Sequence, residues 1–357
     1  MASENTAVDA DAIPEVSDIR RRELIEKLGS IVPEVESTTW ALLWLSDIEQ
    51  LEDFCSMKRG PLLLAFRAPT RQILMQWASR VRNIDPAKTL KRKRSESIKE
   101  TCVIRDRCCV LTGKEEPIEV AHIYPYGMMG KPNTEHEQFW QYLESYWDLE
   151  KIQKWKNAVL GENGTEVLQN VLCLSRDSHG LWGKARFALQ PLEVSVDHKT
   201  LTVRFFWIPI SKYMKTMDLK TMPSIPSNLG HTRKRIKLFN CESEKQIYSG
   251  DIITITTTDP DEYPLPSFEL LQMQWLLTRA LGLSGAADLD SEDWDDSDSE
   301  EEMELVERPR GRLHNLQENE PPSRAHSRAS SKAATTSRNT SRNSSRNISM
   351  PVTSPRR

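Results

Sequence analysis

The chain has 357 residues, of which 38% are hydrophobic, and its formal net charge at pH 7 is −4. This length is enough for about two domains with sizeable cores. No apolar run approaches the roughly 18 residues that a membrane span requires, and the acidic N-terminus lacks the basic and then apolar order of a signal peptide. The six cysteines include no C-x-x-C pair, which disfavours a disulfide scaffold and a zinc ribbon. We therefore expect an intracellular protein with no membrane partner.

The charge is distributed unevenly along the chain. Residues 58–99 contain 12 Lys and Arg but two Asp and Glu, whereas residues 100–200 contain 11 basic and 15 acidic residues. A protein that holds duplex nucleic acid needs clustered basic side chains. The distribution therefore permits a nucleic-acid partner and predicts that residues 58–99 make the main electrostatic contact.

Residues 1–84 are expected to form a helical N-terminal region, because apolar residues recur every three to four positions, as in Leu24, Ile25 and Leu28. Residues 85–100 lose this periodicity and read as a basic linker. A run of four basic residues in this linker is either solvated or a nuclear import signal that also contacts phosphate, and we favour a nuclear protein. The run consists of Lys91, Arg92, Lys93 and Arg94.

Residues 101–192 change to short strands around turns. Segments 108–111 and 118–123 predict a β-hairpin that ends in His122. Aromatic residues at helical spacing predict a helical insertion over about residues 134–160. Asn170 then precedes an apolar run, and Ser175 is a good N-cap for a helix that carries His179.

Residues 193–284 are expected to form a mixed strand and helix extension, with strands near 200–208 and 251–257 and a helix over 268–281. Residues 285–357 are acidic first and then rich in Ser, Arg and Asn. Such a composition buries too little apolar surface to offset the ordering entropy, so this tail is predicted to be disordered. The fold class expected for the whole chain is α+β.

Three short segments carry motif residues in a fixed order along the chain. They are Cys109-Val-Leu-Thr-Gly113, Val120-Ala-His-Ile-Tyr-Pro125, and the segment from Asn170 to His179. This order of His, Asn and His resembles the HNH endonucleases of the His-Me finger family, whose shared unit is a ββα fold with a metal ion between hairpin and helix. The flanking segments also resemble the extended fungal HNH domain-containing proteins.

The resemblance implies metal-dependent hydrolysis of nucleic-acid phosphodiester bonds, with DNA favoured over RNA. His122 would be the general base, because a neutral imidazole has a pKa near operating pH. His179 would hold a divalent ion such as Mg, Mn, Zn or Ni, and Asn170 would orient the loop that carries His122. Beside this site, Lys184 and Arg186 could position the phosphate.

Two positions depart from the family pattern. Ala121 and Gly183 stand where many members have further metal ligands. A cation held by one imidazole binds weakly, although Asp177 or His136 could supply a replacement ligand. The alternative interpretation is therefore a catalytically degenerate HNH-fold module that serves as a nucleic-acid or protein binding scaffold.

Overall fold

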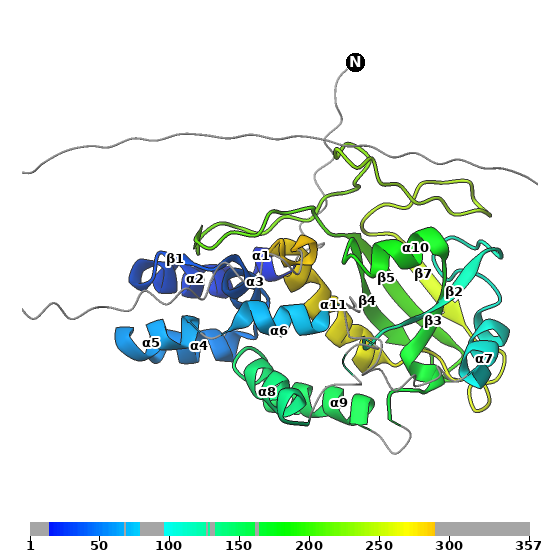
Figure 1. The fold of residues 1–357 in the computed structure, drawn as a ribbon, viewed down its shortest axis with the longest axis horizontal. Coiled ribbons are helices and arrows are strands. Elements are labelled where there is room, and N and C mark those ends of the chain that lie inside the picture. The colour runs from blue at the N-terminus through cyan, green and yellow to red at the C-terminus, as the bar shows by residue number, and fades with distance from the viewer. Residues whose placement is uncertain are drawn as a thin grey trace, which may run out of the picture. The chain divides into compact units, whose positions relative to one another are not determined.

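The computed structural model describes residues 14–67, 69–78, 96–125, 128, 133–160 and 164–289. These residues form both helices and strands, which confirms the predicted α+β class (Figure 1). The basic run Lys91–Arg94 lies outside the described residues, and so does the predicted disordered tail from residue 290 onward. None of the described helices is long and apolar enough to cross a membrane.

The N-terminal region is helical. Its elements are α1 (Pro14–Ser17), α2 (Ile19–Ile31), β1 (Glu34–Val35), α3 (Ser37–Leu45), α4 (Ile48–Ser56), α5 (Arg59–Phe66) and α6 (Thr70–Trp77). Every residue of α3 is buried. A helix that is buried on all sides belongs to the centre of a core rather than to a surface.

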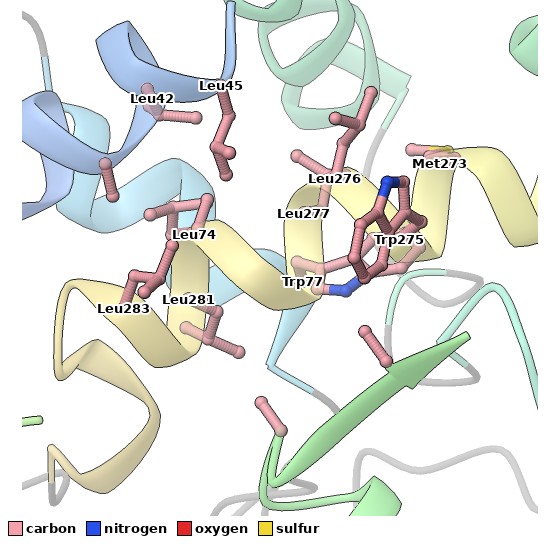
Figure 2. Packing of buried hydrophobic residues seen from close by; sticks show 14 of the residues in the cluster. Leu42, Leu45, Leu74, Trp77, Met273, Trp275, Leu276, Leu277, Leu281 and Leu283 are labelled. Atoms are coloured by element: carbon pink, nitrogen blue, oxygen red, sulfur yellow. The ribbon is translucent and has the colours of Figure 1, made fainter. Parts of the chain in front are cut away.

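The partner that buries α3 comes from the far end of the chain. It is α11 (Phe268–Leu283), which is followed by the short helix η4 (Ala286–Asp288). Figure 2 shows side chains of α3, α6 and α11 packed against one another, among them Leu42, Trp77 and Leu277. The core therefore joins the N-terminal helices to the C-terminal extension, over about 200 residues of sequence.

The middle of the chain contains a ββα unit. Its elements are α7 (Glu96–Asp106), β2 (Ile118–His122), α8 (Asn133–Leu143), α9 (Leu149–Leu160), η3 (Leu168–Asn170), β3 (Val171–Ser175) and α10 (Arg176–Trp182). Strands β2 and β3 are antiparallel, with His122 opposite Val171 and Ile118 opposite Ser175. Helices α7 and α10 lie beside these two strands (Figure 1).

The predicted pairing of segments 108–111 and 118–123 is wrong. Residues 109–114 form a tight turn, in which the Cys109 amide donates to the Lys114 carbonyl at 2.9 Å and the Gly113 amide donates to Cys109 at 2.9 Å. The strand that pairs with β2 is β3, which lies beyond the helices α8 and α9. Local periodicity cannot reveal a partner at that sequence separation.

A second sheet supports the ββα unit. Its strands are β4 (Phe187–Val194), β5 (Thr200–Trp207) and β7 (Ile252–Thr256), in the antiparallel order β4-β5-β7. Helix α11 packs on β4, and β6 (Met217–Asp218) pairs with β1 of the N-terminal region. Because β4 begins soon after α10, this sheet fixes the C-terminal end of that helix.

Candidate active site

His122 is the last residue of β2, and its imidazole contacts a carboxylate. Nε2 of His122 lies 2.9 Å from Oε1 of Glu166, and the histidine side chain is 9% exposed. The backbone carbonyl of His122 accepts a hydrogen bond from Nε1 of Trp182 at 3.1 Å. The end of β2 is therefore attached both to the loop that carries Glu166 and to α10.

Asn170 is buried beside His122 and connects two backbone segments. Its Oδ1 accepts from the amide of Tyr124 at 2.8 Å, and its Nδ2 donates to the carbonyl of Thr165 at 2.9 Å. The carbonyl of Asn170 also accepts from the amide of Ile123 at 2.8 Å. One side chain thus holds the residues that follow His122 against the loop that precedes β3.

His179 lies on α10, which Ser175 caps as expected through a hydrogen bond from the Ser178 amide. Nδ1 of His179 lies 2.6 Å from Oε2 of Glu119, and the two side chains are 30% and 42% exposed. Because side chains alternate along a strand, Glu119 lies on the same face of β2 as Ala121, the face toward α10. His122 is on the alternate face, at the end of the strand.

Neither carboxylate, Glu119 or Glu166, was expected from the sequence. Glu166 is 44 residues from His122, and Glu119 is 60 residues from His179. Neither glutamate belongs to a motif with its histidine, so no spacing in the sequence marks the pair. The antiparallel register of β2 and β3, together with the return of α10, brings these residues together.

The two positions that depart from the family pattern, Ala121 and Gly183, differ in the space that they leave for a larger side chain. Ala121 is completely buried in the core. Gly183 is the C-cap of α10 with φ −62°, and a Cβ there would meet one atom within 4 Å, the His179 carbonyl oxygen, at 3.6 Å. Position 183 therefore has room for a side chain, and its backbone does not require glycine.

Glu119 and His179 fit a divalent cation. An imidazole nitrogen and a carboxylate oxygen are ligands that Zn, Mn and Ni accept. Two such atoms at about 2.1 Å from one tetrahedral ion are about 3.4 Å apart. The distance of 2.6 Å between Nδ1 of His179 and Oε2 of Glu119 would therefore have to widen for an ion to bind. The two replacement ligands considered from the sequence are elsewhere: Asp177 is exposed, and His136 is on α8 with a buried Nδ1.

A second group of metal-ligating side chains is Cys102, Asp106 and Cys173, whose ligand atoms all lie within 4.8 Å of one another. Asp106 already accepts two hydrogen bonds from the buried guanidinium of Arg105, at 2.7 and 3.1 Å. The hydrogen bond to Cys173, together with burial, holds the pKa of Cys102 far above its usual range. Arg105 thus supplies the positive charge that a metal would bring, and this group is better explained as a buried polar cluster.

The buried polar cluster of Cys102, Arg105, Asp106 and Cys173 also holds the backbone around Asn170 in place. Arg105 donates to the carbonyl of Leu168 at 2.9 Å and to that of Val171 at 2.7 Å, on either side of Asn170. The Cys173 amide donates to Asp106 at 2.7 Å. The cluster therefore fixes the start of β3, and with it the position of Asn170.

The two basic residues expected to contact phosphate differ. Lys184 is exposed, as a phosphate contact requires. Arg186 is 1% exposed and forms an ion pair with Asp288, so its burial does not favour the role that the sequence suggested. A run of basic residues at 233–237 contains three consecutive cations, but its charge is hidden in the sum over residues 201–284, where ten basic residues face eight acidic ones.

Comparison with known proteins agrees with this geometry. Residues 109–190 match the family model described as HNH endonuclease. No curated protein and no solved structure gives a significant match. An HNH domain implies a nuclease-type or nucleic-acid-binding function, and its boundaries enclose His122, Asn170 and His179. The middle part of the chain, residues 109–190, is thus similar to the HNH domain family.

Proposed function

We propose that this protein is a metal-dependent endonuclease that hydrolyses phosphodiester bonds of nucleic acid, with DNA as the favoured substrate. The observation that carries the proposal is the hydrogen-bonded position of Asn170, which fixes the backbone directly after His122. A structural asparagine of a surface turn would bond its own neighbours. This one spans 46 residues to reach Tyr124.

His122 would remove a proton from the attacking water. An imidazole is suited to this step because its pKa lies near neutral pH. Glu166, at 2.9 Å, would hold the ring and stabilise the imidazolium that forms. The bond from Trp182 to the His122 carbonyl keeps the end of β2 against α10 while the ring acts.

Glu119 and His179 would hold the divalent cation. When bound, such an ion neutralises the charge that develops on the phosphate and on the departing oxygen. Glu119 would thereby take over a role that the family assigns to the position of Ala121, from the same face of β2. Lys184, exposed just after α10, would contact the phosphate backbone near the site.

Three observations favour the alternative, a catalytically degenerate scaffold. The His122 side chain lies on the face of β2 opposite to Glu119 and its partner His179. Ala121 and Gly183 contribute no ligand, and His179 is bonded directly to Glu119. Two ligands leave most of the hydration shell of the ion in place and bind it weakly. The scaffold would bind nucleic acid or protein through the HNH fold without cleaving it.

Nicking of supercoiled plasmid DNA decides between these functions. The assay compares the wild type with His122→Ala in the presence of Mg, Mn, Ni or Zn. His198→Asn is the matched control, because His198 is exposed and has φ 55°, a conformation that asparagine tolerates. We expect nicking by the wild type and the control, and a loss of about 100-fold or more in His122→Ala. Equal nicking by all three proteins, or none by any, would contradict the nuclease.

We also propose a nuclear location, with Lys91–Arg94 as the import signal. A fluorescent fusion in which these four residues are alanine should lose nuclear accumulation. Unchanged accumulation would contradict the role of this run.

A further inference from the structure

A strongly basic loop lies outside the histidine site. We define the basic loop as residues 229–237, which contain four Lys and Arg and no Asp or Glu. An isolated β-bridge between Leu229 and Ile236 closes the loop, and Arg235 at its turn has φ 48°. Its cationic side chains are all exposed, namely Arg233, Lys234, Arg235 and Lys237.

The basic loop is next to the HNH helix. Nζ of Lys234 lies 3.6 Å from Oδ1 of Asp288, and Arg186 pairs with the same carboxylate oxygen. The Arg186 amide donates to the carbonyl of Leu181 in the last turn of α10, at 3.0 Å. A nucleic-acid backbone that contacts the loop would therefore continue toward the end of α10, where Lys184 is exposed.

The loop carries more positive charge than its surroundings neutralise. Within the described ranges, no carboxylate lies within 4 Å of the cationic groups of Arg233, Arg235 or Lys237. Lys234 is 53% exposed even in its contact with Asp288. Four neighbouring cations repel one another, and that cost is recovered when they meet a polyanion.

The segment that presents this loop is unusually long. Residues 219–251 contain neither a helix nor a strand, although two isolated bridges fold the segment back on itself. A connection of this length inside a compact unit is uncommon unless it binds something. Nε1 of Trp207 donates a hydrogen bond to the Ile247 carbonyl at 2.9 Å. This bond and the two bridges give the segment a defined shape.

We infer that the basic loop binds the sugar-phosphate backbone of the duplex on which the HNH site acts, and that Asp288 takes the place of a phosphate in the free protein. A carboxylate beside an exposed lysine, as Asp288 is beside Lys234, occupies a place that a phosphate oxygen can take. The inference rests on the proposed function for its substrate, but binding can be measured without cleavage. According to this inference, the basic loop beside the HNH domain makes the main electrostatic contact, rather than residues 58–99.

The test is the affinity of the full chain for a fluorescein-labelled 20-base-pair DNA duplex, measured by anisotropy in EDTA between 50 and 200 mM NaCl. The loop variant combines Arg233→Gln, Lys234→Gln and Arg235→Gln. We expect its affinity at 50 mM salt to fall at least tenfold. The slope of log affinity against log salt should become shallower by about 3, since each phosphate contact contributes about one unit.

The matched control removes three exposed cations elsewhere, through Arg22→Gln, Lys27→Gln and Lys199→Gln. It changes the net charge of the chain equally, and we expect it to keep most of the affinity and the slope. In the opposite direction, Asp288→Asn should tighten binding several-fold. A thermal unfolding scan of each variant verifies that it is folded.

Three results would overturn the inference: wild-type affinity in the loop variant, an equal loss in the control, or a loss confined to replacement of Lys91–Arg94. The same titration with an RNA duplex distinguishes the two polymers that share this backbone. Because EDTA prevents metal-dependent cleavage, the outcome is independent of nicking. A protein that binds through the loop but never cuts would contradict the nuclease and support this inference.

Discussion

Replacement of Asn170 by alanine tests the centre of the proposed site. The side chain is 1% exposed and makes two hydrogen bonds to backbone groups, the Tyr124 amide and the Thr165 carbonyl. Alanine leaves both groups without these partners. The Tyr124 amide belongs to a completely buried residue, whereas Thr165 is partly exposed and water can reach it.

The expected loss of unfolding free energy follows from these two groups. A buried amide without a partner costs about 1–3 kcal/mol, and the loss of a bond to a solvated carbonyl costs about 0.5–1.5 kcal/mol. The total is about 2–4 kcal/mol, which for a folded unit of this size lowers Tm by about 5–15 °C. Nicking should also fall at temperatures where the variant is folded, because the segment after His122 is no longer held.

The assay is thermal unfolding followed by circular dichroism, with plasmid nicking measured 15 °C below each midpoint. The control is Asn157→Ala, since Asn157 is exposed on α9 and accepts one bond from Gln153. Its unfolding free energy should change by no more than about 0.5 kcal/mol. A midpoint for Asn170→Ala within 2 °C of the wild type would refute the reasoning.

Three further predictions concern a ligand, an ion pair and a close contact. Gly183→His adds an imidazole one helical turn after His179, so Zn should raise the Tm of this variant more than that of the wild type. The control Gly180→His, whose side chain points elsewhere, should respond to Zn as the wild type does. Equal Tm shifts in the two variants would contradict the prediction. Burial opposes the charge of Glu15, but the Arg279 guanidinium holds its pKa below the usual 4.5. Glu15→Gln should therefore cost about 3 kcal/mol in urea unfolding at pH 7, and the difference from the wild type should shrink as pH falls through the lowered pKa. Equal urea midpoints for the two proteins at pH 7 would refute the ion pair. Gly282→Ala places a Cβ against a methyl carbon of Ile208, closer than side-chain carbons pack, and should lower the unfolding free energy by about 1–3 kcal/mol. An unchanged urea midpoint would contradict the packing.

The elements that were predicted well are those with a local cause. The helices near Leu24 and Leu28, the insertion helices α8 and α9, and the capped start of α10 follow from periodicity and from the hydroxyl of Ser175. The closing helix was also expected, but not its burial on all sides. That burial depends on α3, which lies more than 200 residues earlier.

The site divides in the same way. His122, Asn170 and His179 are recognisable in the sequence because their order and neighbouring residues form a motif. Glu119 and Glu166 are not, because they become partners of the histidines through the pairing of β2 with β3 across the helical insertion. The mistaken hairpin has the same cause, since a nearby segment with strand-like residues was preferred to a distant one.

The length, the uneven charge, the α+β class and the order of the three motif residues can be read from the amino-acid sequence, because each depends on residue identity or on neighbours a few positions away. Which cations can reach a phosphate depends instead on the fold. The fold buries Arg186 against Asp288 and exposes the cations of the loop at Arg233–Lys237, although each of these side chains counts as one positive charge in the sequence. Net charge sums residues irrespective of burial, whereas a phosphate interacts with those cations that solvent can reach and no carboxylate already neutralises.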